Sequence, residues 1–121
     1  MKSLPINEYI ELRKHPKMGR GIFARKILRK SLTVSMTPTW ELSASDKKKI
    51  DRSSISGHWF DNPEKPGSAL LALGALALVN NSKSPNAYIE WKKSNLGWIG
   101  RLKTSRKVRK GGQILIDYDL L

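Results

Sequence analysis

The chain has 121 residues, which suits a single domain, and 23 lysine and arginine residues against 10 acidic ones give a formal net charge of +13. Such a surplus on one small domain predicts attraction to an anionic partner. With no cysteine, the sequence excludes disulfides, zinc fingers and a thiol nucleophile, and its two histidines lack metal-ligand spacing. We therefore expect one domain over residues 1–121 and no metal site.

The N-terminus and the apolar segments indicate where in the cell the protein is expected. The first residues lack the apolar core of a secretory signal peptide. The longest apolar run, Ala69–Val79, has 11 residues, whereas a membrane-spanning helix needs about 20. We therefore expect an intracellular protein of the cytoplasm or nucleus that is not secreted and has no membrane partner.

Short strands and turns dominate the first part of the chain. Apolar alternation and β-branched residues predict strands at Ile6–Arg13, Ile22–Ala24 and Leu32–Met36. A proline and two glycines make the segment His15–Gly21 a turn.

The middle of the chain is predicted to hold the helices. The polar segment Pro38–Arg52 is expected to contain one short helix, N-capped by Ser45 or Asp46. The run Ala69–Leu78 is rich in alanine and leucine, which favour helix, and Ser68 is its expected N-cap.

The other predictions complete a mainly β domain with short helices (α+β). Asparagine, serine and proline in Asn80–Asn86 argue against regular structure, and Asp61–Gly67 has the composition of a loop. The remaining expected strands are Ile55–Phe60, Ala87–Trp91, Leu96–Leu102 and Ile114–Tyr118. The pattern has no βαβ alternation, which excludes a Rossmann-type nucleotide fold.

Three segments contain residues whose types are not explained by packing alone. The two glycines of Gly19-Arg20-Gly21 would let the backbone approach a ligand. The alternative is a plain turn, which is the commoner explanation of such a pair of glycines. The amides of Asn80–Asn86 could bind buried backbone or a ligand, and the alternative is a helix C-terminus followed by an asparagine-capped turn. The segment Gly111–Tyr118 ends a strong β pattern in a tyrosine, for which the alternative is a place in the core or on an edge strand.

In this order, the three segments resemble the motifs of the SET-domain family of protein-lysine methyltransferases. GRGIFA at Gly19–Ala24 resembles its glycine turn and F-A strand. NNSKSPN at Asn80–Asn86 resembles its N-H-S-x-x-P-N stretch, and GGQILIDY at Gly111–Tyr118 resembles its closing G-E-x-x-x-x-D-Y strand. The resemblance covers Tyr9–Leu121, and the size is similar to minimal single-domain members such as the viral SET protein.

The resemblance implies a β-clip of small sheets in which the N-H-S segment and the final strand thread together as a C-terminal pseudoknot. It also implies that S-adenosylmethionine binds one face and that a target lysine enters a narrow channel from the other. Tyr118 is the implied catalytic residue, placed where sulfonium, methyl and lysine amine meet. The implied cofactor-binding residues are Met18, Gly19, Arg20, Gly21, Asn80 and Asn81.

The sequence departs from the family pattern at two site positions and at its end. Asn81 stands where the family has histidine, and Arg20 lies between the two glycines. A cysteine-rich C-terminal segment is absent from the 121 residues, so we expect any aromatic lid to come from another chain or the substrate. Trp59 and Phe60 could line the channel, although core packing is the commoner fate of such residues.

The predicted function is protein-lysine methylation that depends on S-adenosylmethionine. The expected partner is a protein substrate with a target lysine, held on an anionic nucleic-acid assembly, and the resemblance also allows a homodimer. The alternative is a non-catalytic binding module of the same fold that contacts nucleic acid or an acidic partner. The six basic residues in Arg101–Lys110 argue for that alternative.

Overall fold

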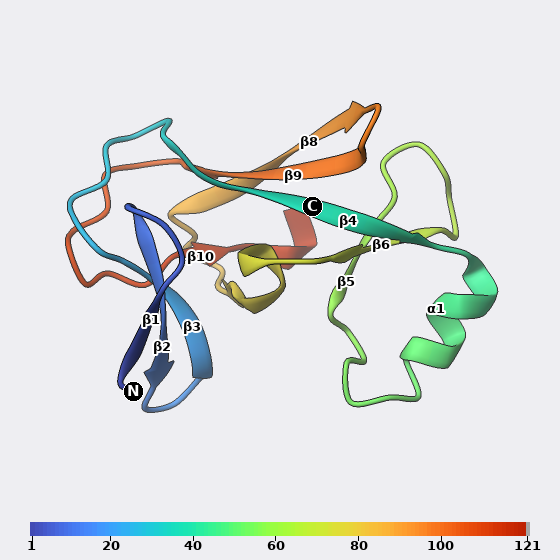
Figure 1. Cartoon of the computed structure of the whole chain (residues 1–121), viewed down its shortest axis with the longest axis horizontal. Helices are drawn as coiled ribbons and strands as arrows, with labels where there is room; N and C mark the ends of the chain where they lie inside the picture. Colours follow the sequence, from blue (N-terminus) through green and yellow to red (C-terminus); the bar gives the residue numbers. More distant parts are fainter. Residues whose placement is uncertain (121) are drawn as a thin grey trace.

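The computed structural model describes residues 1–120, and short strands in small sheets make up most of it (Figure 1). The described part contains one three-stranded, one five-stranded and one two-stranded sheet. The mainly β architecture with short helices is therefore confirmed.

The N-terminal sheet forms one end of the molecule (Figure 1). Its strands β1 (Ser3–Pro5), β2 (Ile10–His15) and β3 (Gly19–Ala24) pair antiparallel in that order. The β2–β3 hairpin closes with His15 opposite Gly19, whose φ of 75° is one that glycine adopts without strain. The expected turn is therefore shorter than His15–Gly21.

The strand expected over Ile6–Arg13 begins only at Ile10. The side-chain oxygen of Asn7 accepts hydrogen bonds from the backbone N–H groups of Tyr9 and Ile10, at 2.8 and 3.1 Å. This local bonding turns the chain ahead of the strand, as asparagine side chains commonly do.

The long strands of the five-stranded sheet run roughly along the long axis of the molecule (Figure 1). All its strand pairs are antiparallel, in the order β5-β6-β4-β9-β8. Its members are β4 (Thr33–Leu42), β5 (Trp59–Asp61), β6 (Ala69–Ala72), β8 (Ala87–Ser94) and β9 (Gly97–Thr104).

Strand β4 is longer than predicted. It continues through Pro38–Leu42, where the composition predicts a polar, helix-containing segment. The reason is a change of partner along the strand, because β9 pairs with its first half and β6 with its second. In contrast, β5 begins only at Trp59, since turns occupy most of the expected strand Ile55–Phe60.

The short helix exists, but neither predicted residue caps it. Helix α1 (Ala44–Ile50) is capped by Ser43, whose hydroxyl accepts from the backbone N–H of Asp46 at 3.1 Å. Ser45 and Asp46 therefore lie in the first turn. The helix buries no residue and projects at the opposite end from the N-terminal sheet (Figure 1).

The helix predicted over Ala69–Leu78 is wrong. Residues Ala69–Ala72 form β6 between β5 and β4, and a one-turn 3₁₀ helix, η1 (Ala75–Leu78), follows. Ser68 caps no helix; its buried hydroxyl donates to the carbonyl of Leu42 at 3.0 Å. Strand pairing on both sides overrides the helix propensity of alanine and leucine here.

The C-terminal part threads back through the fold. Strand β7 (Asn80–Asn81) pairs in parallel with β10 (Leu115–Ile116), and the residues between them form β8 and β9. Two residues of the segment expected to be irregular are thus strand. The expected strand Ile114–Tyr118 is shortened, because Tyr118 begins a second 3₁₀ helix, η2 (Tyr118–Leu120).

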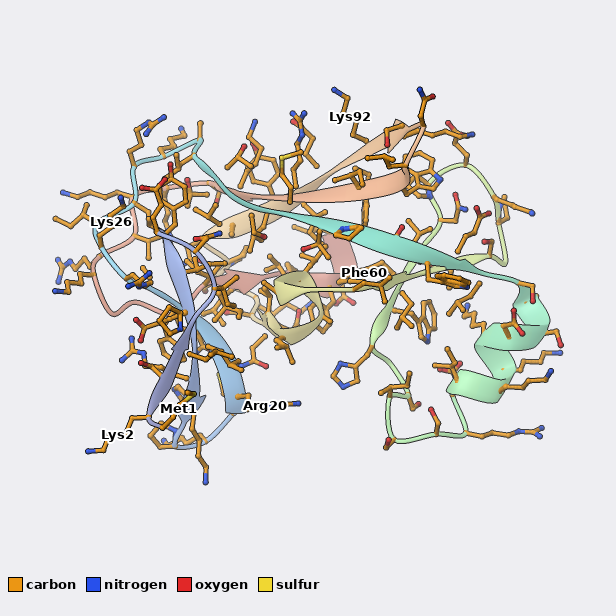
Figure 2. All side chains as sticks on the ribbon, in the orientation of Figure 1. Met1, Lys2, Arg20, Lys26, Phe60 and Lys92 are labelled. Atoms are coloured by element: carbon orange, nitrogen blue, oxygen red, sulfur yellow. The ribbon has the colours of Figure 1, made fainter. Side chains whose placement is uncertain are left out.

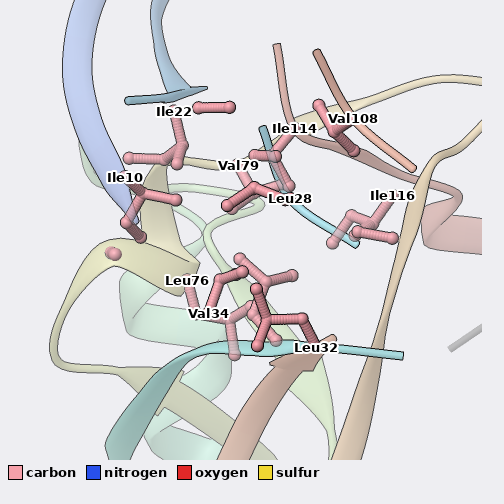
Figure 3. Close-up of a cluster of buried hydrophobic side chains, with 14 of the residues drawn as sticks. Ile10, Ile22, Leu28, Leu32, Val34, Leu76, Val79, Val108, Ile114 and Ile116 are labelled. Atoms are coloured by element: carbon pink, nitrogen blue, oxygen red, sulfur yellow. The ribbon is translucent and has the colours of Figure 1, made fainter. Parts of the chain in front are cut away.

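The core lies where these parts meet (Figure 3). Ile10 and Ile22 enter from the N-terminal sheet, Val34 from β4, Leu76 from η1 and Ile116 from β10, all with at most 1% exposure. The strand pair β7–β10 is therefore held against the body of the protein by apolar burial as well as by its own bonds.

Candidate functional site

The site lies where the Gly19 end of β3, the η1–β7 segment and Tyr118 come together. A cavity of about 180 Å³ opens there, and we call it the polar cavity. Its walls combine charged, amide and phenol groups with apolar ones, as small-molecule sites commonly do. The lining residues are Met18, Arg20, His58, Ala77, Leu78, Val79, Asn80 and Tyr118.

A second cavity adjoins the first, and His58, Ala77 and Tyr118 line both. This apolar cavity has a volume of about 70 Å³ and is narrow. Its walls are mainly aromatic and aliphatic: Gly57, His58, Trp59, Phe60, Leu76, Ala77 and Tyr118. Phe60 lies in the middle of the molecule, whereas Arg20 projects from the free end of β3 (Figure 2).

A third, wider hollow of about 530 Å³ continues the polar cavity outward. The two share Arg20, His58, Ala77 and Leu78. Three adjoining spaces therefore surround His58 and Ala77, which gives room for an extended ligand as well as for a side chain entering beside it.

Asn80 is fixed at the floor of the polar cavity by two bonds. Its side-chain amide donates to the carbonyl of Arg20 at 3.0 Å and to the side-chain oxygen of Gln113 at 2.8 Å. Gly21 makes this arrangement possible, because a Cβ there would lie 2.5 Å from Gln113 Oε1 and 2.9 Å from Asn80 Nδ2. Among the described residues, the side-chain oxygen of Asn80 accepts no hydrogen bond, so it remains available to a ligand.

Tyr118 is positioned at three points. Its backbone N–H donates to the side-chain oxygen of Asn81 at 2.8 Å, and its hydroxyl donates to the carbonyl of Val79 at 2.5 Å. Its ring meets Phe60 edge to face, with centroids 6.5 Å apart and an interplanar angle of 87°. Partial burial of the phenol raises the pKa of Tyr118 above its ordinary value.

Asn86 ties the two threaded segments together. Its side-chain amide donates to the carbonyl of Gln113 at 2.8 Å, and its side-chain oxygen accepts from the backbone N–H of Leu115 at the same distance. Asn86 thus satisfies two backbone groups at the start of β10, on Gln113 and Leu115. The asparagines of Asn80–Asn86 therefore serve the threading and the cavity, and cap no helix.

The structure brings the sequence-predicted residues together in different ways. Met18, Arg20, Asn80 and Tyr118 line the polar cavity. Gly21 and Asn81 do not line it. Gly21 leaves space for the Asn80 side chain, and Asn81 accepts a hydrogen bond from the backbone N–H of Tyr118. Gly19 is exposed at the end of the hairpin and lies outside the cavity walls.

Sequence reasoning missed four contributors. Val79 and Gln113 bind Tyr118 and Asn80, and His58 and Ala77 line all three spaces. His58 holds its ring 3.4 Å from the carbonyl of Ala77. A lone histidine and small apolar residues give no sequence signal; Gln113, inside the G-G-Q-I-L-I-D-Y segment, could have been found from its position beside the last strand.

Residues 1–120 contain neither a membrane-spanning helix nor a metal-binding cluster. No helix in this part of the chain is long and apolar enough to cross a membrane. No cluster of three or more histidine, aspartate or glutamate side chains there could hold a metal ion.

Comparisons with known proteins agree on one family. Residues 19–119 match the model of the SET domain. The histone-lysine N-methyltransferase of Schizosaccharomyces pombe specific for H3 lysine-37 is 24% identical over 113 residues, which cover 93% of this chain and 75% of that protein.

Solved structures share the fold. A Plasmodium falciparum candidate histone methyltransferase has a TM-score of 0.75 and 25% identity, with 93% of this chain and 95% of that chain covered. The ctPRC2 complex bound to S-adenosylmethionine has a TM-score of 0.76 at 15% identity, with 92% of this chain and 15% of that chain covered. At that identity the second similarity concerns the fold alone.

Proposed function

The chain belongs to the SET-domain family, and we propose that it is a protein-lysine methyltransferase that uses S-adenosylmethionine. The observation that carries the proposal is the position of Tyr118, which lines both a polar cavity and a narrow apolar one. Methyl transfer needs a methyl donor and a lysine that enter the site from different sides. The two cavities give each reactant its own space, and both spaces adjoin the Tyr118 phenol. Membership of the family and the histone-lysine methyltransferase relative support the activity.

The residues of the polar cavity suit S-adenosylmethionine. The guanidinium of Arg20 can pair with the carboxylate of its amino-acid moiety. The free side-chain oxygen of Asn80 can accept a hydrogen bond from an amino group, and Gly21 leaves the space in which Asn80 is held. The wider hollow continues from Arg20 and Leu78 and offers apolar surface to the remainder. When bound, the cofactor would supply an activated methyl group on a sulfonium.

The apolar cavity suits the aliphatic stem of a lysine. Phe60 and Trp59 provide aromatic walls, and Phe60 is itself held edge to face against Trp91 with centroids 5.5 Å apart. Transfer of a methyl group requires a neutral amine, and a narrow apolar space lowers the pKa of a lysine because it disfavours the charged form. A nearby sulfonium charge acts in the same direction.

The hydroxyl of Tyr118 has its proton committed to the carbonyl of Val79. The oxygen lone pairs are therefore the part of the phenol that faces the reactants. They can accept weak C–H···O contacts from a polarised methyl group, which orients that group toward the amine. Asn81 acts as a positioning residue, since its side chain holds the backbone N–H of Tyr118.

We propose histone lysines as the first substrates to test, because the S. pombe relative is described as a histone-lysine methyltransferase. Tritium transfer from labelled S-adenosylmethionine to purified histones should label at least one band. No labelled lysine with any histone or with a cell lysate, from a folded sample, would refute the proposed activity.

Cofactor binding should be measured separately by calorimetric titration. Wild type should bind S-adenosylmethionine, and Asn80→Ala should bind it at least 10-fold more weakly, the effect of losing about 1.4 kcal/mol. Asn95→Ala, in the exposed β8–β9 turn, is the matched control and should bind as wild type does. Absence of heat at saturating cofactor would contradict the assignment of the polar cavity.

A further inference from the structure

Two connections that are far apart in the sequence have the same structure. Residues 24–32 and 104–112, which we call the paired basic loops, share one succession of strand end, bend, bridge and turn. Their burial also matches residue by residue from 24 to 31 and from 104 to 111: one buried residue, three exposed, one buried, three exposed. Each ends in a left-handed residue, Ser31 at φ 63° and Gly111 at φ 82°.

Their backbone hydrogen bonds are related by a local twofold. Leu28 and Val108 at the centre exchange both bonds, each at 2.9 Å. Toward one end the N–H of Ser31 donates to the carbonyl of Thr104 at 2.9 Å, and at the other the N–H of Gly111 donates to the carbonyl of Ala24 at 2.8 Å. The two loops therefore lie side by side and antiparallel, as the cyan and orange-red connections of Figure 1 show.

The exposed positions of both loops are mainly basic. Leu28 and Val108 are buried anchors with 0% and 4% exposure, and two cations flank each of them on either side. The eight cations, all exposed, are Arg25, Lys26, Arg29, Lys30, Arg106, Lys107, Arg109 and Lys110. Lys26 marks this end of the molecule in Figure 2.

Few acidic groups offset this charge. Lys26 pairs with Glu8 at 3.2 Å, and Arg25 lies 3.9 Å from Glu11. The other six cations form no salt bridge with any of the described residues. The sequence contains no acidic residue between Glu11 and Glu41, nor between Glu90 and Asp117. The field of the paired basic loops is therefore uniformly positive.

We infer that the paired basic loops bind the phosphate backbone of a nucleic-acid duplex. A duplex presents two antiparallel phosphate strands related by twofold axes, and a twofold pair of loops can place equivalent cations against both. An acidic peptide has no such symmetry. Neither loop carries an aromatic residue, so neither offers a platform on which unpaired bases would stack. The contacts would be to phosphates, which fix position without reading sequence.

The paired basic loops lie away from the cavities, and β3 connects the polar cavity to the first loop. Strand β3 begins beside the polar cavity at Gly19 and reaches the first loop at Ala24. The five residue steps between these ends span about 17 Å at about 3.4 Å a step. A duplex on the loops would leave the cavities open. Binding would hold the protein on a nucleic-acid assembly and would not depend on methyl transfer.

The test is the salt dependence of duplex binding, measured by anisotropy of a fluorescein-labelled DNA duplex of mixed sequence. The loop variant Arg29→Gln/Lys30→Gln/Arg106→Gln/Lys107→Gln removes four cations that have no acidic partner among the described residues. The control variant Lys48→Gln/Lys49→Gln/Arg52→Gln/Lys92→Gln removes four other exposed cations. Binding is followed from about 50 to 200 mM NaCl, a range over which phosphate contacts weaken steeply.

We expect the loop variant to bind at least 10-fold more weakly at the lower salt. Its slope of log K against log salt should fall by about 0.9 for each phosphate that the variant no longer neutralises, so by roughly 3 to 4 in all. The control variant should keep a slope close to that of wild type. Circular dichroism and methyl transfer to a free peptide should stay unchanged in both, which separates this inference from the proposed activity.

Three outcomes would overturn the inference. Equal weakening by the two variants would mean that only the total charge matters. Competition by poly-glutamate as effective as by the duplex would favour an acidic protein partner. Equally tight binding of a single strand of the same length would remove the argument from twofold symmetry.

Discussion

The site and the paired basic loops are both built from chain segments that are far apart in sequence, but they are built differently. The site joins unlike segments, in which Gly21 leaves the space where the Asn80 amide binds the carbonyl of Arg20 and the side chain of Gln113. The loops join like segments, in which buried Leu28 and Val108 set the backbone and the exposed positions need only be cationic. Single substitutions should therefore reduce function strongly at the site and only slightly at the loops.

The variant Tyr118→Phe should show the largest effect of a single substitution at the site. The ring and its packing against Phe60 remain, but the oxygen at the junction of the two cavities is removed. We expect turnover to fall by about 100-fold or more, the scale for one preorganised polar group, while cofactor affinity changes little. Tyr88→Phe, on the exposed strand β8, is the control for initial rates of labelled methyl transfer. Undiminished turnover would remove Tyr118 from the mechanism.

Gly21→Ala tests whether the floor of the polar cavity depends on one missing Cβ. The added methyl would lie 2.5 Å from Gln113 Oε1 and 2.9 Å from Asn80 Nδ2, so both side chains must move. We expect a loss of about 1–3 kcal/mol in unfolding free energy and at least 10-fold weaker S-adenosylmethionine binding.

The control for Gly21→Ala is Gly97→Ala, because it strains a left-handed backbone but has nothing within 4 Å of the new methyl. Urea denaturation and calorimetry measure the two effects. Normal cofactor affinity in Gly21→Ala would mean that Asn80 does not contact the cofactor.

Asn86→Ala tests the threading itself. It removes two 2.8 Å bonds and leaves the carbonyl of Gln113 and the N–H of Leu115 without their partner. We expect urea denaturation to show a loss of about 2–3 kcal/mol in unfolding free energy, with Asn95→Ala unchanged. A loss no larger than that of the control would mean that apolar burial alone holds β10 in place.

The smallest expected effect is a change in alkaline stability. The folded-state pKa of Tyr118 is raised above 10.0 by burial, so the folded protein holds this proton more tightly than the unfolded chain. The resulting stabilisation is complete below pH 10.0 and is lost as pH rises through the folded-state pKa. Thermal midpoints of Tyr118→Phe should therefore decline less steeply than those of wild type across that range. Parallel curves would indicate an exposed, ordinary phenol.

The sequence motifs predicted the family and four residues that line the polar cavity of the candidate site. The roles of these residues in binding and catalysis stay predictions. Asn80 and Tyr118 stand in segments whose composition no ordinary loop or strand requires. His58 and Val79 could not be found, since only the threading brings them beside Tyr118. The helix prediction at Ala69–Leu78 is wrong for a similar reason. The pairing of β6 with β4 and β5 joins residues far apart in the sequence. The sequence shows the clusters of basic residues in the two loops. It does not show their twofold relation, which depends on the backbone hydrogen bonds between Leu28 and Val108.

The central claim is that the polar cavity binds S-adenosylmethionine with its methyl group toward Tyr118. A crystal structure of the chain with the cofactor tests it most directly. We predict density for the cofactor along Arg20 and Asn80, with the sulfonium methyl pointing past the Tyr118 hydroxyl into the apolar cavity. Density elsewhere on the protein, or an empty polar cavity in crystals grown at saturating cofactor, would contradict the account.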